Sequence, residues 1–483
     1  MEAFHSRTVY SPSVSGQSNF QKRKLTMRTK TLPWVSLLLL LVASLSIVAE
    51  NRLDPIRLYI QKHFAGRLEI TQEQIEQLSW VLDNPVFTPE LSTQSPSTSI
   101  HREVPRALSR LYCLQLLRAG SHDAYEAFVA PQTNPEIPRL TEPSFRQLSR
   151  EIARLDSVSY EVLRAAAILD AVTLSPEARK RAGKVLDKPV PEDTMDFLSV
   201  TAPYADKIYP LAHSIITKDP EAARLFDIVY LPHSHLRHMM YNEGSLSMYT
   251  VLNTGIQNKS ISRADLNLWY DHWVVNIAGF RGHSDPMGSV YLTQNTWRSM
   301  NQLKLLLDRL FREPKMNPMQ VYLQKRGQWL HLNTLTRNPN EFLALASLGA
   351  MARLFTPAEG RALYTSFKSL PENEQKQWIQ YSRKQLTTLG TPSPTYGPAV
   401  YANAIAVAGL PETVRKVLPV MLRVYEEADR MRAEGRLAAD IPLSFRELAQ
   451  EPMLGNILSS YRQFTTSINP DDGVAKLVMR EEP

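Results

Sequence analysis

The sequence predicts an all-α protein, in which a multi-helix globular region follows a single N-terminal transmembrane or signal segment. Glycine is scarce, with 18 residues in 483, against an average of about 7% in proteins. Apolar residues recur at three- and four-residue intervals through most of the chain, which is the spacing of amphipathic helices. The 33 prolines fall mainly between these periodic stretches, where they separate one helix from the next.

The N-terminal part predicts a membrane segment. Residues 1–31 form a basic polar tail, and residues 32–49 (LPWVSLLLLLVASLSIVA) carry no charge. Eighteen helical residues rise about 27 Å, enough to span a bilayer. Since basic residues dominate before this segment, we expect a single-pass membrane protein with a cytoplasmic N-terminus, which contacts the membrane through residues 32–49.

A cleaved signal peptide is the alternative. Met27 could be the true start, which would leave a short basic region before the apolar one. The end of the segment is a mediocre cleavage site, because Ile47 occupies a position that favours a small residue. Cleavage would make the protein secreted or periplasmic, and residues 50–483 form the working part under either hypothesis.

The rest of the chain divides at changes of composition. Residues 50–83 are expected to form a helical stalk, in which Thr71 and Gln74 have capping-box spacing. Residues 84–102 are rich in Pro, Ser and Thr and predict a linker. Residues 103–468 predict one helical domain, and residues 469–483 a polar, frayed tail.

Inside the helical domain, cap residues and apolar periodicity mark individual helices. Ser-Pro-Glu, Asp-Pro-Glu and Thr-Pro-Ala-Glu signatures predict helix starts at 175–177, 219–221 and 356–359. Residues 340–355 are apolar on nearly all sides and predict a buried helix. Residues 411–434 predict a long helix that Pro419 could kink.

Single residues and net charge limit the chemistry. The one cysteine, Cys113, lies in an apolar helical pattern, so we expect a buried thiol without a disulfide. His213 is also expected in the core. The net charge of +7 is mild for this length, and no basic block beyond the N-terminus resembles a nucleic-acid footprint, so no nucleic-acid partner is expected.

Residues 231–292 are the candidate functional region. Five of the chain's 11 histidines fall within 51 residues of it: His233, His235, His238, His272 and His283. A helix over 232–253, capped by Ser234, would place His235, His238 and Asn242 on one face. Two imidazoles about one turn apart can hold a metal ion or take part in proton transfer. Glu243 lies beside this face.

The second half of the region predicts a buried helix over 262–280 that ends in a loop. His272 and Asn276 form a thin polar stripe on this helix, so both need polar partners. Asp265 also lies on the stripe, but its spacing from Ser262 favours a capping box. The loop (GFRGHSDPMGS) carries an arginine, a histidine and a carboxylate between glycines at 279, 282 and 288, which suits an anionic group.

This layout resembles the HD-type phosphohydrolases, which are all-helical enzymes that hydrolyse phosphoesters with His and Asp metal ligands. In that resemblance His238 matches the first histidine, and the loop around His283 and Asp285 the later motif. The family's adjacent His-Asp pair occurs here in reversed order, as Asp271-His272. The phosphodiesterase domains of SidE-type effectors are a metal-free relative whose two histidines and glutamate correspond to His238, His283 and Glu243.

Two functional hypotheses follow. The first is a membrane-tethered or exported hydrolase of a small phosphorylated substrate, in which a divalent metal is a candidate cofactor. Its candidate catalytic residues are His235, His238, Glu243, Asp271, His272, Arg281, His283 and Asp285. The alternative is a non-catalytic, membrane-anchored helical protein that binds a protein partner. Close approach of His238, His272 and His283 would favour the hydrolase.

Overall fold

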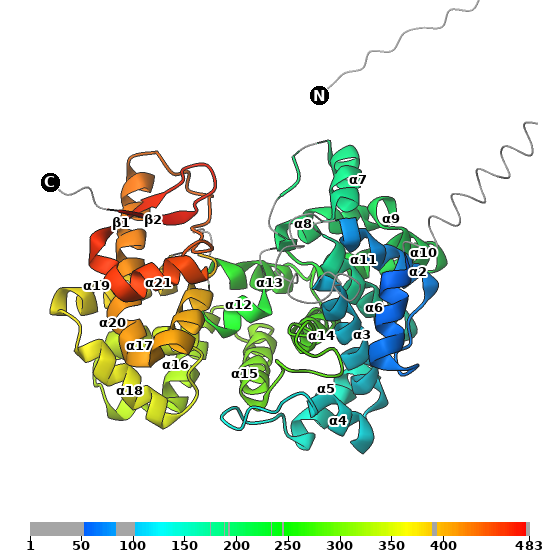
Figure 1. The fold of residues 1–483 in the computed structure, drawn as a ribbon, viewed down its shortest axis with the longest axis horizontal. Helices are drawn as coiled ribbons and strands as arrows, with labels where there is room; N and C mark the ends of the chain where they lie inside the picture. Colours follow the sequence, from blue (N-terminus) through cyan, green and yellow to red (C-terminus); the bar gives the residue numbers. More distant parts are fainter. Residues whose placement is uncertain are drawn as a thin grey trace, which may run out of the picture. The chain divides into compact units, whose positions relative to one another are not determined.

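The computed structural model describes residues 53–83, 102–173, 175–187, 189–191, 194–232, 234–243, 246–388 and 394–479 (Figure 1). Helices dominate these residues, and strands occur only in one two-stranded hairpin among them, which confirms the all-α prediction. The predicted membrane segment, residues 32–49, and most of the predicted linker lie outside the described residues. Within the described part, no helix combines the length and the apolar character needed to cross a bilayer.

The helices before residue 311 follow one another with short connections. After a helix over residues 53–64, they are α2 (Gln72–Leu78), η1 (Ser79–Asp83), α3 (Glu103–Ala119), α4 (His122–Val129), α5 (Glu142–Ala153), α6 (Ser157–Val172), α7 (Pro176–Leu186), α8 (Thr194–Thr201), η4 (Ala202–Tyr204), α9 (Ala205–Ile208), α10 (Pro210–Lys218), α11 (Glu221–Val229), α12 (Leu236–Met240), α13 (Ser247–Gln257), α14 (Arg263–Ala278) and α15 (Gln294–Leu310).

The remaining elements end in the hairpin. They are α16 (Pro318–Trp329), η5 (Leu332–Thr334), α17 (Pro339–Met351), α18 (Pro357–Lys368), α19 (Glu372–Thr387), α20 (Gly397–Ala433), α21 (Glu451–Ser460), η6 (Tyr461–Gln463), β1 (Phe464–Ile468) and β2 (Ala475–Met479). The antiparallel strands pair Phe464 with Met479, and β1 packs on α20.

Helix α14 lies at the centre of the first group of helices, in contact with α3, α6 and α11 (Figure 1). Its residues Leu266–Ala278 are almost all buried. The four leucines of α3 that predicted an apolar face, at 108, 111, 114 and 117, are fully buried against these neighbours. The expected stalk also packs here, since α2 contacts α6 and α10. Residues 53–83 thus share one compact unit with the rest of the described chain.

Two buried hydrogen bonds join α12 to the later helices. Tyr322 on α16 donates its hydroxyl to the carbonyl of Met240 at 2.7 Å. Asn242, which follows α12, donates its amide to Ser347 Oγ on α17 at 2.6 Å. The predicted buried helix over 340–355 is α17, and its residues Ala344–Met351 are all buried.

The predicted helix starts are present. Ser175 caps α7 through the amide of Ala178, and Asp219 accepts a hydrogen bond from the amide of Glu221. Full capping boxes start α2, with Thr71, and α18, with Thr356. Local hydrogen bonds of this kind depend on sequence spacing alone, which is why the sequence predicts them well.

Three predictions about the fold were wrong. The tail is not frayed throughout, because residues 475–479 pair with β1 around a turn in which Gly473 has φ +70°. The kink in α20 lies at Gly409, with φ +75° and ψ +168°, and not at Pro419. His213 is exposed, because α10 buries only Leu211 and Ala212.

Candidate functional site

The first histidine segment is not the single helix that its spacing predicts. Helix α12 ends at Met240, and Asn242 has φ +52° before α13 begins at Ser247. An asparagine in the left-handed region followed two residues later by Gly244 is a typical helix stop. Asn242 therefore does not continue the face of His235 and His238.

His235, His238 and Glu243 nevertheless lie together. The two imidazole rings make an edge-to-face contact, with centroids 4.8 Å apart, and His238 Nε2 lies 3.6 Å from the Glu243 carboxylate. The other Glu243 oxygen accepts a hydrogen bond from the backbone amide of Tyr396. Burial, and then the charge of Arg237, lowers the pKa of His238 to about 3. This imidazole is therefore neutral at physiological pH.

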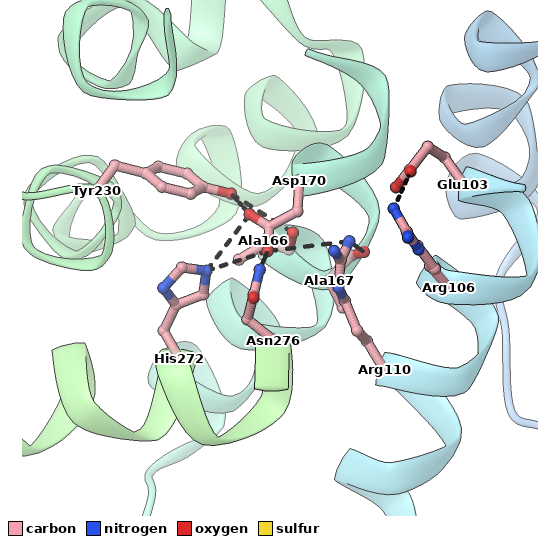
Figure 2. Close-up of polar contacts among 9 residues, drawn as sticks. All are labelled: Glu103, Arg106, Arg110, Ala166, Ala167, Asp170, Tyr230, His272 and Asn276. Atoms are coloured by element: carbon pink, nitrogen blue, oxygen red, sulfur yellow. Dashed lines mark hydrogen bonds and ion pairs between the residues drawn. The ribbon is translucent and has the colours of Figure 1, made fainter. Parts of the chain in front are cut away.

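His272 instead belongs to a buried network centred on Asp170 of α6 (Figure 2). Its Nε2 lies 3.3 Å from Asp170 Oδ2, and Asn276 donates its amide to the same oxygen at 2.6 Å. Tyr230 donates its hydroxyl to Asp170 Oδ1 at 3.2 Å. Arg110 on α3 completes the network, with a guanidinium nitrogen 4.0 Å from Oδ2.

The network keeps Asp170 ionised. Burial alone would raise the pKa of this carboxyl, but His272, Arg110 and the Asn276 amide outweigh burial and lower the pKa to about 2. His272 Nδ1 is also buried and has no hydrogen-bond partner among the described residues. Because the side chains of Asp170 and His272 are only 3% and 2% exposed, a substrate cannot reach this pair, and its role here is to hold α3, α6, α11 and α14 together.

Asp271, the neighbour of His272, faces a different set of groups. Burial raises the pKa of this carboxyl to about 7, while Lys304 lowers it and Glu151 raises it further. Lys304 pairs with Glu151 at 3.3 Å and lies over the ring of Tyr270. Asp271 is therefore not part of the histidine cluster.

The loop after α14 packs against the first turns of α3. Arg106 donates its Nε–H to His283 Nδ1 at 3.1 Å and pairs with Glu103 through another guanidinium nitrogen. Burial, and then the charges of Arg106, Arg102 and Arg281, lowers the pKa of His283 to about 4. The ring is thus neutral, its Nδ1 lone pair is occupied, and only its Nε2–H is left to donate.

The glycines of this loop serve close packing against the protein itself. A Cβ on Gly282 would lie 2.6 Å from the carbonyl of Pro105, and one on Gly279 would meet the backbone nitrogen of Arg110 at 2.5 Å. Asp285 accepts a hydrogen bond from the amide of Met287 at 2.9 Å within the loop. The loop therefore presents its arginine and histidine from a fixed position on α3.

The three key histidines therefore have separate partners: Glu243 for His238, Asp170 for His272 and Arg106 for His283. His235 is close to His272 only through Trp273, whose ring centroid is 5.6 Å from each imidazole. Among the described residues, no three His, Cys, Asp or Glu side chains could jointly hold a metal ion. The Asp265 capping box is confirmed, and Asp265 also pairs with Arg224 at 2.6 Å.

Sequence reasoning missed Asp170, Arg106 and Arg110. Asp170 and Arg164 are the charged residues in the otherwise apolar stretch over 162–172, which is a signal that a buried partner is needed. The chain was compared with protein-family models, characterised proteins and solved structures, and no match was found.

Proposed function

We propose that this chain binds a phosphorylated small molecule at a basic surface formed by Arg102, Arg106, Arg237, Arg281 and His283. The contact between Arg106 and His283 carries the proposal, because it joins two cationic segments that lie 177 residues apart in the chain. Arg281 and His283 are exposed, so a ligand can reach them. Guanidinium groups bind phosphate oxygens with paired, charge-assisted hydrogen bonds.

The charges at this surface are incompletely balanced. Glu103 is shared, since it pairs with Arg106 and lies 3.8 Å from Arg102. Arg106 and Arg237 both lie over the Phe280 ring, with guanidinium carbons 5.3 and 4.4 Å from its centroid. Burial and the charges of Arg110 and Arg102 lower the pKa of Arg106, against the effect of Glu103. A bound oxyanion would relieve this repulsion.

His283 suits binding better than catalysis. A general base needs a free ring nitrogen, but Nδ1 already accepts from Arg106. The Nε2–H can donate to a phosphate oxygen. We therefore assign His283 and Arg281 to ligand binding and not to proton transfer.

Hydrolysis of the bound phosphoester is the second candidate function, and the His238–Glu243 pair favours it. The pair lies 3.6 Å apart, and the charge of Arg353 interacts with Glu243. A neutral imidazole beside a carboxylate can take a proton from water without a metal. Attachment to a membrane, or export, through residues 32–49 remains part of the proposal.

The test is titration of the full chain with inorganic phosphate and p-nitrophenyl phosphate. We expect saturable binding that weakens with added salt and falls about tenfold or more in Arg281→Gln and His283→Gln, because each loses a hydrogen bond to a charged group. Arg312→Gln, at an exposed arginine just after α15, is the matched control and should bind as the wild type does. Absence of binding, or equal loss in the control, would refute the proposal.

Turnover separates the two candidate functions. Release of p-nitrophenol from mono- and bis-(p-nitrophenyl) phosphate should disappear in His238→Gln while binding is retained. Binding without turnover in the wild type would assign a non-catalytic role, as in the alternative of a membrane-anchored helical interaction protein.

A further inference from the structure

A cavity lies between α19 and α20, away from the histidine segments. It encloses about 500 Å³, including its opening to solvent, a size typical of small-molecule sites. Its lining comes from the last turns of both helices and from two residues of the connecting loops. These residues are Tyr381, Lys384, Gln385, Thr388, Pro394, Tyr425, Ala428, Asp429, Arg432 and Leu443.

One wall of the cavity is aromatic and preorganised. Tyr381 and Tyr425 are stacked, with ring centroids 3.7 Å apart and an angle of 19° between their planes. Phe445 supports Tyr425 from another side with an edge contact at 5.3 Å, and Gln385 fixes the Tyr381 hydroxyl with a hydrogen bond of 2.7 Å. A fixed, stacked pair offers a planar ligand a flat contact surface.

The polar groups leave one cation without a counter-ion. Lys384 pairs with Asp429 at 2.7 Å, so these two charges balance. Arg432 donates one guanidinium nitrogen to the carbonyl of Ile441 at 3.0 Å. No carboxylate among the described residues pairs with it, and its Nε is buried without a hydrogen-bond partner there. A buried donor without an acceptor costs about 1–3 kcal/mol, which an acceptor on a ligand would recover.

We infer that this cavity binds a small aromatic carboxylate, whose ring packs on Tyr381 and Tyr425 and whose carboxylate accepts from Arg432. The apolar lining by Ala428, Pro394 and Leu443 suits a ring, and the single unbalanced cation suits one negative charge. The inference is independent of the basic surface, because no residue is shared between the two sites.

The test compares phenylacetate with phenylacetamide and cyclohexylacetate by ligand-detected NMR on the full chain. We expect phenylacetate to bind, the amide to bind at least about tenfold more weakly for lack of charge, and cyclohexylacetate to bind weakly for lack of a planar ring. Equal binding of phenylacetate and its amide, or no binding of phenylacetate at millimolar concentration, would overturn the inference.

Variants locate the site. Arg432→Gln should remove the preference for the carboxylate, and Ala428→Trp should fill the cavity and abolish binding. Arg430→Gln is the matched control on the same helix, since Arg430 is exposed, pairs with Glu427 and does not line the cavity. The circular dichroism spectrum of each variant shows whether it folds. If Ala428→Trp does not fold, Arg432→Gln and the ligand comparison still decide. Unchanged binding in a folded Arg432→Gln variant would refute the assignment.

Discussion

Replacing Asp170 with asparagine tests whether the buried network holds the helices together. The variant keeps the shape of the side chain but removes the charge that faces Arg110, whose side chain is 6% exposed. Lowering the Asp170 pKa from 3.8 to about 2 corresponds to about 2.5 kcal/mol in favour of the ionised form. Removing one member of a buried ion pair costs about 3–5 kcal/mol, because the remaining charge stays buried. We therefore expect a loss of about 3–5 kcal/mol at pH 7.

Urea unfolding at several pH values provides the assay. Because the folded-state pKa is depressed, the contribution of Asp170 is fully present above its unfolded pKa near 3.8 and is lost as the pH falls toward 2. The gap between wild type and Asp170→Asn should therefore narrow below about pH 4. Glu161→Gln, on the same helix with a side chain 51% exposed and 3.6 Å from Arg164, is the control and should cost about 0.5 kcal/mol or less. A loss below about 1 kcal/mol in Asp170→Asn, or a gap independent of pH, would refute this account of the network.

Three further substitutions test other features of the structure. Asp271→Asn should stabilise the protein above pH 7 by about 4 kcal/mol, because the raised pKa of about 7 means that stability is lost as the pH rises from 3.8 through 7; equal effects at pH 4 and pH 8 in urea unfolding would contradict this. Gly282→Ala should lower stability by about 1–3 kcal/mol, since the added Cβ would lie 2.6 Å from the Pro105 carbonyl, and an unchanged melting temperature would be the contrary result. Gly409→Ala meets no atom within 4 Å but must adopt φ +75° and ψ +168°, so thermal unfolding should reveal a backbone cost of about 1–3 kcal/mol, against no change if the kink relaxes.

Local features of this fold can be predicted from the sequence because they depend on nearby residues. The Thr71, Ser262 and Thr356 capping boxes each join a side chain to a backbone amide three residues away. Two local signals were overlooked. The Asn-Pro-Asp-Asp-Gly turn over 469–473 closes the hairpin, and Asn242 stops α12. Both use residues that readily adopt positive φ.

The partners of the site residues could not be predicted in the same way. The polar stripe on α14 indicates that His272 needs a buried partner, but Asp170 lies 102 residues earlier in the chain. Likewise, Arg106 and His283 meet only because the loop after α14 packs on α3. Pairs of this kind depend on how helices pack, and a single sequence does not specify which helix faces cross.

Helix α3 connects the buried network to the proposed binding surface, and this connection offers a way to locate the ligand. Arg102, Arg106 and Arg110 recur at four-residue intervals on one face of α3, where like charges repel. Asp170 balances the innermost of them, and Figure 2 shows Arg110 turned toward it while Arg106 faces Glu103. In a folded Asp170→Asn variant, Arg110 loses its counter-charge, so the positive potential along α3 increases. A phosphoester bound at the basic surface should then bind at least as tightly as in the wild type. A ligand bound at His272 and Asp170 would instead be lost, so this one titration distinguishes the two locations.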